Sequence, residues 1–281
     1  YRHNEQGVAQ RLFEPVQIRQ REQTGGTVGL EEDQQQRAPL DATVRGTADA
    51  LDEEFPYVTD PQGKWKCLPA DQYAGWTAEN WSHGNWFCGF WVGLLWLAFE
   101  VSAEPYFLEE ARRWAERMRF RQSDPNSHDI GFLFIPSFVK GFLLTGESTW
   151  REPALAAAQV LAGRVDDRAG IIQAWGKLDD SRTQGSSTID TMMNLPLLWW
   201  AAGETGDVSF SRAAVRHARA SAAVYIREDG STFHTARFDP VTGVLMDRGD
   251  LSGPLRIVLL VPGAGLGHCW VFGSLPPYGD T

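Results

Sequence analysis

Apolar residues are grouped along this chain into segments of two alternating kinds. In the first kind, of which 192–200 is an example, nearly every position is apolar, which predicts a helix buried on all sides. In the second kind, such as 105–119, apolar positions recur every three or four residues among Arg and Glu, which predicts a helix with one face in water. The alternation therefore predicts helical hairpins that pair a buried helix with a half-buried one.

Three short turns of similar sequence mark these hairpins. Each turn ends in an acidic residue that is followed, within the next two helical turns, by an aromatic residue and then by an alanine. The turns are Ser102-Ala103-Glu104, Thr145-Gly146-Glu147 and Thr205-Gly206-Asp207. The helices expected on either side of them cover 89–101 and 105–119, 130–144 and 149–162, and 188–202 and 208–227.

The repeat of buried and half-buried helices predicts an all-α protein, a toroid with an inner and an outer ring of helices. A solenoid of the tetratricopeptide kind is the competing geometry, but its period is about 34 residues, and the turns of this chain are further apart. The additional residues lie between each outer helix and the next inner helix. We therefore expect the long loops to gather at one end of the toroid.

We expect three regions along the chain. Residues 1–40 are rich in Gln, Arg and Glu, which predicts a disordered extension, whereas 41–250 form the toroid region and 251–281 an atypical tail. Within the toroid region, a first helix is expected over 41–54 and a long loop over 58–84.

The composition narrows the classes of function. With 281 residues, 43% of them hydrophobic, the chain can bury one large core. A formal net charge of -10 without clustered Lys and Arg argues against a nucleic-acid partner. The apolar runs are too short to span a bilayer, so no membrane partner is expected. The sequence leaves the oligomeric state open.

Cysteine usage bears on the compartment. Cys67, Cys88 and Cys269 are odd in number and lack the spacing of metal ligands, so we expect neither a disulfide framework nor a metal site. This favours a reducing compartment and predicts a cytoplasmic location. Because the chain begins with Tyr1 rather than Met, a removed leader stays an open alternative.

Two aspartates occupy equivalent places in the repeat. About four helical turns before each hairpin turn lie Trp86, Asp129 and Asp190, so these residues should share one end of three parallel inner helices. Either aspartate alone is best explained as a helix N-cap. Two at matching positions favour catalysis, because neighbouring carboxylates can divide into a proton donor and an anion that steadies an oxocarbenium-like centre.

Aromatic residues near the same end are candidates for sugar stacking. Trp175 lies in a short extended run, 170–176, and an indole at such a site can stack on a sugar ring. For Trp86 and Trp175, the sequence supports contact with a substrate and burial in the core equally. Trp91 and Trp96, inside the first apolar helix, are expected in the core.

Two histidines lie in different surroundings. His234 belongs to an expected strand, 231–235, and could donate a hydrogen bond to a substrate oxygen. His217 lies in an Ala-rich outer helix and is expected at the surface.

As an ordered set, segments over about 42–248 resemble the unsaturated glucuronyl hydrolases of glycoside hydrolase family 88. The matching segments are Trp86-Phe87-Cys88-Gly89-Phe90-Trp91, Gly93-Leu94-Leu95-Trp96-Leu97, His128-Asp129-Ile130-Gly131-Phe132, Ile172-Gln173-Ala174-Trp175-Gly176, Asp190 with Asn194-Leu195-Pro196-Leu197-Leu198, and His234-Thr235. One departure is the pair Phe87 and Cys88, where the family usually has two polar residues.

The resemblance implies an (α/α)6 toroid, the fold of six-hairpin glycosidases, that removes a 4,5-unsaturated uronic acid from the non-reducing end of oligosaccharides made by polysaccharide lyases. It implies that Asp190 protonates C4 of the sugar and then activates water for C5, and that Asp129 supports the substrate and the developing cation. It implies neither a metal nor an organic cofactor. The residues it places at the substrate are Trp86, His128, Gln173, Trp175 and His234.

The resemblance ends near Gly249, where the family continues through further helices. We hypothesise that 251–281 is out of frame and that the toroid is incomplete, which the coding DNA would test. One alternative is therefore an inactive helical-hairpin fragment that acts at most as a binding module. A second is an unsaturated rhamnogalacturonyl hydrolase, which substrate choice would distinguish.

Overall fold

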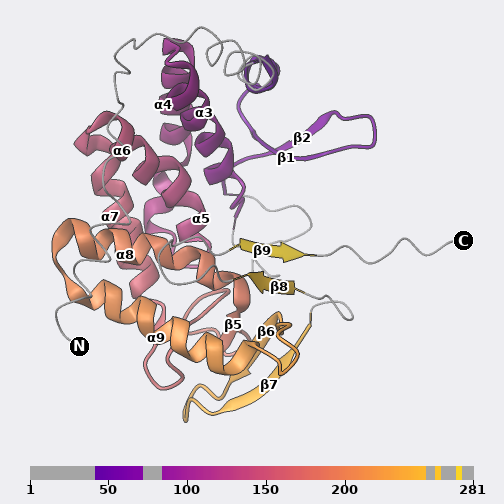
Figure 1. Ribbon diagram of the computed structural model, residues 1–281, viewed down its shortest axis with the longest axis vertical. Helices are drawn as coiled ribbons and strands as arrows, with labels where there is room; N and C mark the ends of the chain where they lie inside the picture. Colours follow the sequence, from indigo (N-terminus) through magenta and orange to yellow (C-terminus); the bar gives the residue numbers. More distant parts are fainter. Residues whose placement is uncertain (1–41, 72–83, 251–256, 261–269, 274–281) are drawn as a thin grey trace, which may run out of the picture.

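The computed structural model describes residues 42–71, 84–250, 257–260 and 270–273 (Figure 1). The α-helices are 42–50, α3 (Cys88–Ser102), α4 (Pro105–Met118), α5 (Ile130–Phe134), α6 (Lys140–Thr145), α7 (Ser148–Ala162), α8 (Leu195–Thr205) and α9 (Val208–Tyr225). The 3-10 helices are η2 (Arg119–Ser123) and η4 (Ile189–Asn194), and η3 (Ile135–Val139) is a π-helical turn. The strands are β1 (Phe55–Thr59), β2 (Trp65–Leu68), β3 (Val165–Asp166), β4 (Ile171–Ile172), β5 (Ser186–Thr188), β6 (Thr235–Phe238), β7 (Leu245–Gly249), β8 (Ile257–Leu260) and β9 (Trp270–Gly273).

The three predicted helical hairpins are present. Helix α3 is followed by α4, the α5–η3–α6 run by α7, and α8 by α9, and Figure 1 shows the three pairs in succession from α3–α4 to α8–α9. The buried helices end in left-handed residues at Ala103 (φ 58°), Gly146 (φ 71°) and Gly206 (φ 75°). The N–H of each donates to a carbonyl in the last turn of its helix, which ends the helix and turns the chain back.

Packing of the hairpins produces two layers. The run α5–η3–α6 packs against both α3 and α8 in the inner layer, while α7 packs against α9 in the outer layer. Four tryptophans fill the space between the layers: Trp96, Trp114, Trp150 and Trp200. Trp91 and Trp96 are 5% and 0% exposed, so their predicted place in the core is confirmed.

The loop expected over 58–84 is in part a β-hairpin, and that part of the prediction is wrong. Strands β1 and β2 pair in antiparallel fashion, from Phe55 opposite Leu68 to Thr59 opposite Trp65. Asp60 stabilises the connecting turn, because its carboxylate accepts from two backbone N–H groups of the turn. Residues 72–83 of the expected loop lie outside the described part of the chain.

The inner helices are less regular than predicted. Pro136 has no N–H to donate along the helix, and the backbone takes up the π-helical turn η3 at this position. The third inner helix was expected to start at Thr188, which is wrong. Thr188 instead pairs with Thr235 of β6, a 3-10 turn follows, and α8 begins at Leu195, just before Pro196, a residue suited to a first helical turn.

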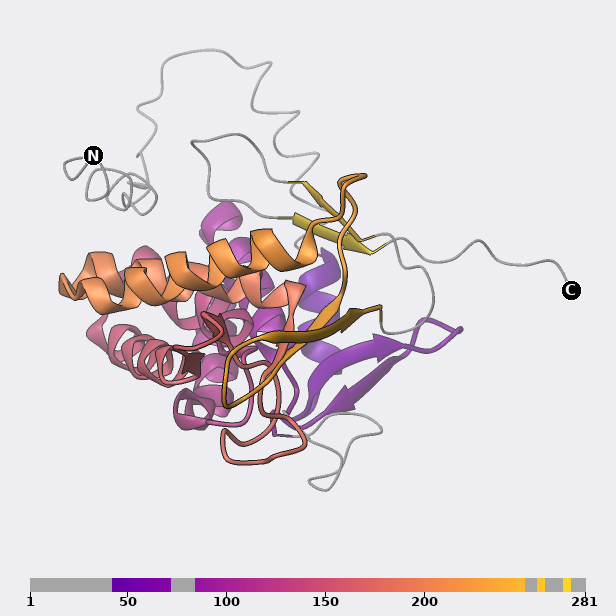
Figure 2. The same cartoon turned by 90° about the horizontal axis from the view of Figure 1, so that it is seen from below.

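Short strands lie beyond the ends of the outer helices. Strands β5, β6 and β7 form an antiparallel sheet, and β3 pairs with β4. Figure 2 shows the orange strands β6 and β7 following the end of α9. The strand expected at 231–235 is displaced: Thr232 forms a single bridge to Ile226, and β6 begins at Thr235.

The outer regions of the chain are described only in part. The expected extension, 1–40, lies outside the described residues, as does most of the expected tail. In the tail, β8 and β9 pair with each other. In the part of the chain that is described, every helix is too short or too polar to pass through a bilayer.

Candidate active site

Two carboxylates and one imidazole meet where the inner helices begin. Asp129 directly precedes α5 and Asp190 lies in η4. Nε2 of His128 is 3.3 Å from Oδ1 of Asp129 and 3.3 Å from Oδ2 of Asp190. The expected convergence of the two aspartates on one place is therefore found, and their catalytic role remains a prediction.

Neither aspartate side chain caps a helix. Asp129 occupies the N-cap position of α5, but its carboxylate makes no cap hydrogen bond. It accepts instead from the hydroxyl of Ser127 (3.1 Å), and that hydroxyl in turn accepts from the Asp129 N–H (2.9 Å). The N-cap of η4 is Thr188, not Asp190. The capping explanation, which either residue alone would favour, is therefore wrong for both.

His128 carries a proton on each ring nitrogen. Nδ1 lies 2.8 Å from the carbonyl oxygen of Ala174, which can only accept, so Nδ1 bears a hydrogen. Nε2 faces the carboxylates of Asp129 and Asp190. Without a proton, the lone pair of Nε2 would be repelled by these negative oxygens, whereas a proton on Nε2 is attracted to both of them. Burial by itself would lower the pKa of His128, but the charges of Asp129 and Asp190 and these hydrogen bonds raise the pKa to about 9. At neutral pH the cluster therefore holds an imidazolium between two acids.

Asp190 is the acid that faces outward. Its side chain is 33% exposed, whereas the side chain of Asp129 is 5% exposed. Burial opposes ionisation of Asp190, but the neighbouring His128 cation and the Thr188 hydroxyl outweigh that effect and lower its pKa. Among the described residues, Oδ1 of Asp190 has no hydrogen-bond partner. This oxygen is itself buried, and the exposed surface belongs to the rest of the Asp190 side chain.

The same three residues have ligand atoms within 4.8 Å of one another, which is close enough for a cation. A metal-binding imidazole must be deprotonated, so a proton on Nε2 of His128 and a bound cation are alternatives at this place. The prediction that no metal is involved remains a prediction.

Trp86 and Trp175 lie close in the chain to residues that neighbour the cluster. The Trp86 ring stacks on Phe87 with a centroid distance of 3.9 Å and lies 5.3 Å from the ring of Phe132, which belongs to α5. Trp175 pairs through its backbone with Ser127, one residue before His128. Both residues are half-buried, and their contact with a substrate remains a prediction.

Gln173 and His234 differ in what their side chains contact. The Gln173 amide donates to the carbonyls of Trp175 and Lys177, at 3.2 Å each, and so supports its own loop. The His234 carbonyl accepts from Ile189 N–H, which brings His234 beside the Asp190 turn. Burial lowers the pKa of His234 more than the nearby acids raise it, so the imidazole is neutral at neutral pH.

His217 is not at the surface, contrary to expectation. Its side chain is fully buried; Nδ1 accepts from Ile172 N–H (2.9 Å) and Nε2 lies 3.3 Å from the Ser221 hydroxyl. Burial lowers its pKa to about 3. The spacing of Phe210, Ala214, His217 and Ser221, three or four residues apart on one face of α9, is a signal that could have revealed its burial.

Other functional residues were also missed from the sequence. Ser127 orients Asp129, and the hydroxyl of Thr188 lies 3.2 Å from Nε2 of His128. Arg164, directly before β3, holds the Trp175 loop through backbone carbonyls. Ser127 and Thr188 each lie two residues before an aspartate, and this shared spacing of a hydroxyl residue is a signal that could have identified them. No local sequence pattern identifies Arg164.

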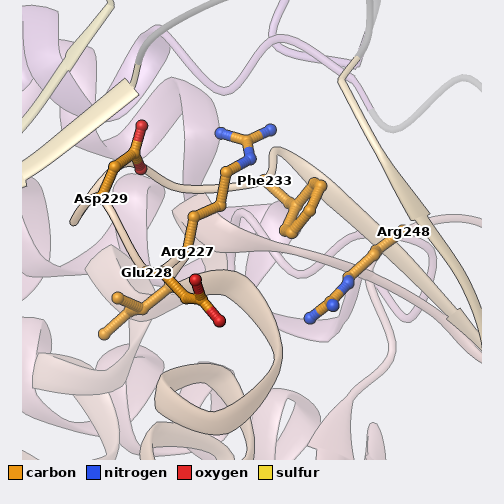
Figure 3. A pocket seen from close by; sticks show the side chains of 6 residues that line it. Arg227, Glu228, Asp229, Phe233 and Arg248 are labelled. Atoms are coloured by element: carbon orange, nitrogen blue, oxygen red, sulfur yellow. The ribbon is translucent and has the colours of Figure 1, made fainter.

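A hollow of about 420 Å³ lies elsewhere, beside the segment that leads to His234 (Figure 3). It is lined by Ile226, Arg227, Glu228, Asp229, Phe233 and Arg248. The guanidinium groups of Arg227 and Arg248 lie 3.9 and 4.6 Å from the centre of the Phe233 ring, and Arg227 also pairs with Asp250. These contacts anchor the segment before His234 and include neither carboxylate of the site.

Known proteins with similar sequences are hydrolases of unsaturated sugars. The chain is 36% identical over 206 residues to an unsaturated glucuronyl hydrolase of Bacillus sp. (strain GL1), covering 72% of this chain and 51% of the relative. It is 37% identical over 207 residues to an unsaturated chondroitin disaccharide hydrolase of Streptococcus pyogenes serotype M1, covering 71% and 47%. The chain thus spans about half the length of these relatives. No family model matches it.

Solved structures agree with this likeness. The unsaturated glucuronyl hydrolase of Bacillus sp. GL1 superposes with a TM-score of 0.67 at 34% identity, over 75% of this chain and 53% of that one. A chain named UGL with dGlcA-Glc-Rha-Glc superposes with a TM-score of 0.71 at 32% identity, over 79% and 56%. The predicted fold class is confirmed, and the described helices make up part of the α/α toroid. The chain is thus homologous to the unsaturated glucuronyl hydrolases of glycoside hydrolase family 88.

Proposed function

We propose that this chain carries the catalytic residues of a hydrolase that removes a 4,5-unsaturated uronic acid from the non-reducing end of lyase-generated oligosaccharides. The observation that carries the proposal is the meeting of Asp129 and Asp190 on one buried imidazole, in a chain homologous to hydrolases of this kind. The reaction hydrates the vinyl ether double bond. No organic cofactor or metal is needed for its steps.

In the first step, the C4–C5 double bond takes a proton at C4 from the Asp190 carboxyl group. The electrons of the double bond form the new C4–H bond, and positive charge appears at C5 and the ring oxygen. Water then adds to C5 and gives a proton to Asp190, which restores the acid. The resulting hemiketal opens with cleavage of the bond between C5 and the ring oxygen, and the rest of the oligosaccharide is released from C1.

His128 supplies the proton that Asp190 needs. Before substrate binds, Asp190 is ionised and the proton lies on Nε2 of His128, 3.3 Å from Oδ2 of Asp190. A bound uronate excludes water, and this desolvation raises the pKa of a carboxyl group and lowers the pKa of an imidazolium. Substrate binding therefore favours transfer of the proton from His128 to Asp190, directly before it is required at C4.

Asp129 has the supporting role in this proposal. It is almost fully buried and holds the His128 cation through Oδ1, while Ser127 fixes Oδ2. In this position its charge stabilises the cation that develops at C5. The burial of Asp129 supports its proposed supporting role, and the partial exposure of Asp190 supports its proposed role in proton transfer.

The remaining predicted residues position the sugar. Trp175 and Trp86 offer half-buried ring faces to it, and His234, neutral beside the Asp190 turn, can donate to a hydroxyl. Gln173 contributes through the shape of the Trp175 loop, which its amide supports. We propose a substrate of the kind named for the relatives, an unsaturated chondroitin disaccharide or dGlcA-linked oligosaccharide.

The test is turnover of an unsaturated chondroitin disaccharide, followed by the loss of ultraviolet absorbance of the conjugated double bond. We expect Asp190→Asn to reduce kcat by about 10²–10⁴-fold, and the control Asp180→Asn, in a surface loop, to leave it unchanged. Equal rates for the wild-type protein and Asp190→Asn would overturn the assignment.

Two alternatives have distinct outcomes. An inactive fragment that acts as a binding module would bind the disaccharide in calorimetry without consuming it. An unsaturated rhamnogalacturonyl hydrolase would instead consume oligosaccharides from rhamnogalacturonan. For the compartment we propose the cytoplasm, on the observation that the described cysteines, Cys67 and Cys88, are free thiols.

A further inference from the structure

We infer that Arg164 is a positioning residue of this active site: its buried guanidinium clamps the Trp175 loop to the segment that carries His128 and Asp129. The expected effect on kcat rests on the proposed function. The expected effect on the position of the Trp175 loop rests only on the contacts of Arg164.

Arg164 is 1% exposed and is surrounded by backbone carbonyls. Nε donates to the oxygen of Gln173 (2.9 Å), and Nη2 donates to those of Ala174 (3.0 Å) and Gly176 (3.1 Å). Nη1 donates to the oxygen of Pro125. Four of the five N–H donors of this side chain are thereby used on two loops that are far apart in the sequence.

The side chain makes no ion pair within the described part of the chain. Burial lowers the pKa of Arg164 to about 10, so the group is still charged at neutral pH. A buried cation is costly and is retained where its hydrogen bonds and nearby charges compensate it. The charges of Asp124 and Asp129 supply that compensation. Arg164 thus also offsets part of the negative charge of the catalytic cluster.

The carbonyl of Ala174 links Arg164 to the catalytic groups. Besides the bond from Arg164, it accepts from His128 N–H (3.0 Å) and from Nδ1–H of His128 (2.8 Å). The oxygen that fixes the His128 ring is thus itself fixed by the guanidinium. A continuous set of contacts runs from Arg164 through Ala174 and His128 to Asp190.

The Pro125 contact ties the second loop. Pro125 lies two residues before Ser127, which bridges to Trp175 and orients Asp129. A methionine at 164 would fill a similar volume without any N–H donor. A lysine would keep the charge, but its single nitrogen cannot match the planar fork that spans four carbonyls.

The experiment compares Arg164→Met and Arg164→Lys with the wild-type protein. The control is Arg151→Met, which removes a half-buried arginine that pairs with Glu204 at the other end of α8. Each protein is labelled with 5-fluorotryptophan, and the ¹⁹F resonance of Trp175 is assigned by its loss in Trp175→Phe. Turnover of the unsaturated disaccharide is measured in parallel.

We expect Arg164→Met to shift or broaden the Trp175 resonance and to lower kcat by about 10–100-fold, because misplaced catalytic groups cost rate. For both the Trp175 resonance and kcat, Arg164→Lys should lie between the wild-type protein and Arg164→Met. Arg151→Met should change neither the resonance nor kcat. A wild-type Trp175 resonance in a folded Arg164→Met or, if that variant does not fold, in Arg164→Lys would overturn the inference. If the wild-type chain has no turnover, the proposed function is wrong. The ¹⁹F resonance of Trp175 in the Arg164 variants would still show whether Arg164 positions the Trp175 loop.

Discussion

Nε2 of His128 lies 3.3 Å from Oδ2 of Asp190, although 62 positions separate the two residues along the chain. The other ring nitrogen is held by the Ala174 carbonyl, so the imidazole cannot rotate without losing that bond. A proton on Nε2 is therefore stored within reach of the partly exposed carboxylate of Asp190. The pKa of His128 and that of Asp190 move apart as a consequence of this contact.

The stored proton predicts an alkaline limit of activity. The pKa of His128 is raised to about 9, so the free enzyme loses this proton as the pH rises through that value. We expect kcat/KM for the unsaturated disaccharide to fall about tenfold per pH unit above pH 9. The measurement is a pH–rate profile, and a rate that still rises above pH 10 would contradict the storage of the proton on His128.

The same contact predicts a pH dependence of stability. Because the pKa of His128 is raised above its ordinary value of 6.5, its contribution to the free energy of unfolding is fully present below about pH 6.5 and is lost as the pH rises through about 9. The difference in free energy of unfolding between the wild-type protein and His128→Asn should therefore shrink between pH 6.5 and 10. Urea unfolding at several pH values measures it, and a constant difference would contradict the ion pair.

His217 predicts the opposite dependence. Its pKa is lowered to about 3 by burial, so its contribution to stability is present above about pH 6.5 and is lost as the pH falls toward 3. His217→Asn keeps an acceptor for Ile172 N–H and does not titrate, so its stability should decline less on acidification. His217→Leu leaves that N–H without an acceptor and should cost about 1–3 kcal/mol at neutral pH. Parallel pH curves for wild type and His217→Asn would exclude a neutral His217.

Substitutions of a tryptophan at the proposed substrate site and of a tryptophan in the core should have different effects on KM. Trp175 is half-buried beside the catalytic cluster, whereas Trp91 is 5% exposed in the core. We expect Trp175→Ala to raise KM by about 2–10-fold through the loss of stacking on the sugar. Trp91→Phe should lower the melting temperature and leave KM unchanged. Unaltered KM in Trp175→Ala would remove Trp175 from the substrate site.

Because α3 and α5 pack closely at Gly89, adding a methyl group there should lower the free energy of unfolding. A Cβ at Gly89 would lie 2.1 Å from the carbonyl oxygen of Phe132, whereas a Cβ at Gly203, an exposed position of α8, would meet nothing within 4 Å. Gly89→Ala should therefore destabilise the fold by about 1–3 kcal/mol or more, and Gly203→Ala should stabilise it by about 0.5–1 kcal/mol. Chemical unfolding measures both, and similar effects of the two substitutions would argue against this helix contact.

Helical periodicity predicted the hairpins well because it depends on local spacing. The left-handed ends at Gly146 and Gly206 and the start of α4 at Pro105 follow from residue types that favour these positions in any context. The start of the third inner helix was wrong because Thr188 gains strand pairing with Thr235, a partner that no local pattern includes. The hairpin of β1 and β2 was missed because its signal is confined to a short turn around Asp60.

The candidate site was predictable to the extent that it follows the repeat. Asp129, Asp190 and Trp86 were identified by equivalent positions, and Trp175 and His234 by the loop and strand expected around them. The family resemblance added His128 and Gln173. The burial of His217 was predicted wrongly because an Ala-rich helix was taken to face water at that residue, whereas β4 covers it and uses its Nδ1 as an acceptor.

The sequence by itself determined the helices, their pairing and the placing of two acids at one end, since these properties arise from contacts between neighbours in the chain. Only the tertiary structure decided which groups touch. The proton on His128, the outward acid at Asp190 and the clamp at Arg164 depend on distances between loops that are remote in sequence. Electrostatic and hydrogen-bond energies change steeply over such distances, and no pattern of residue types specifies them.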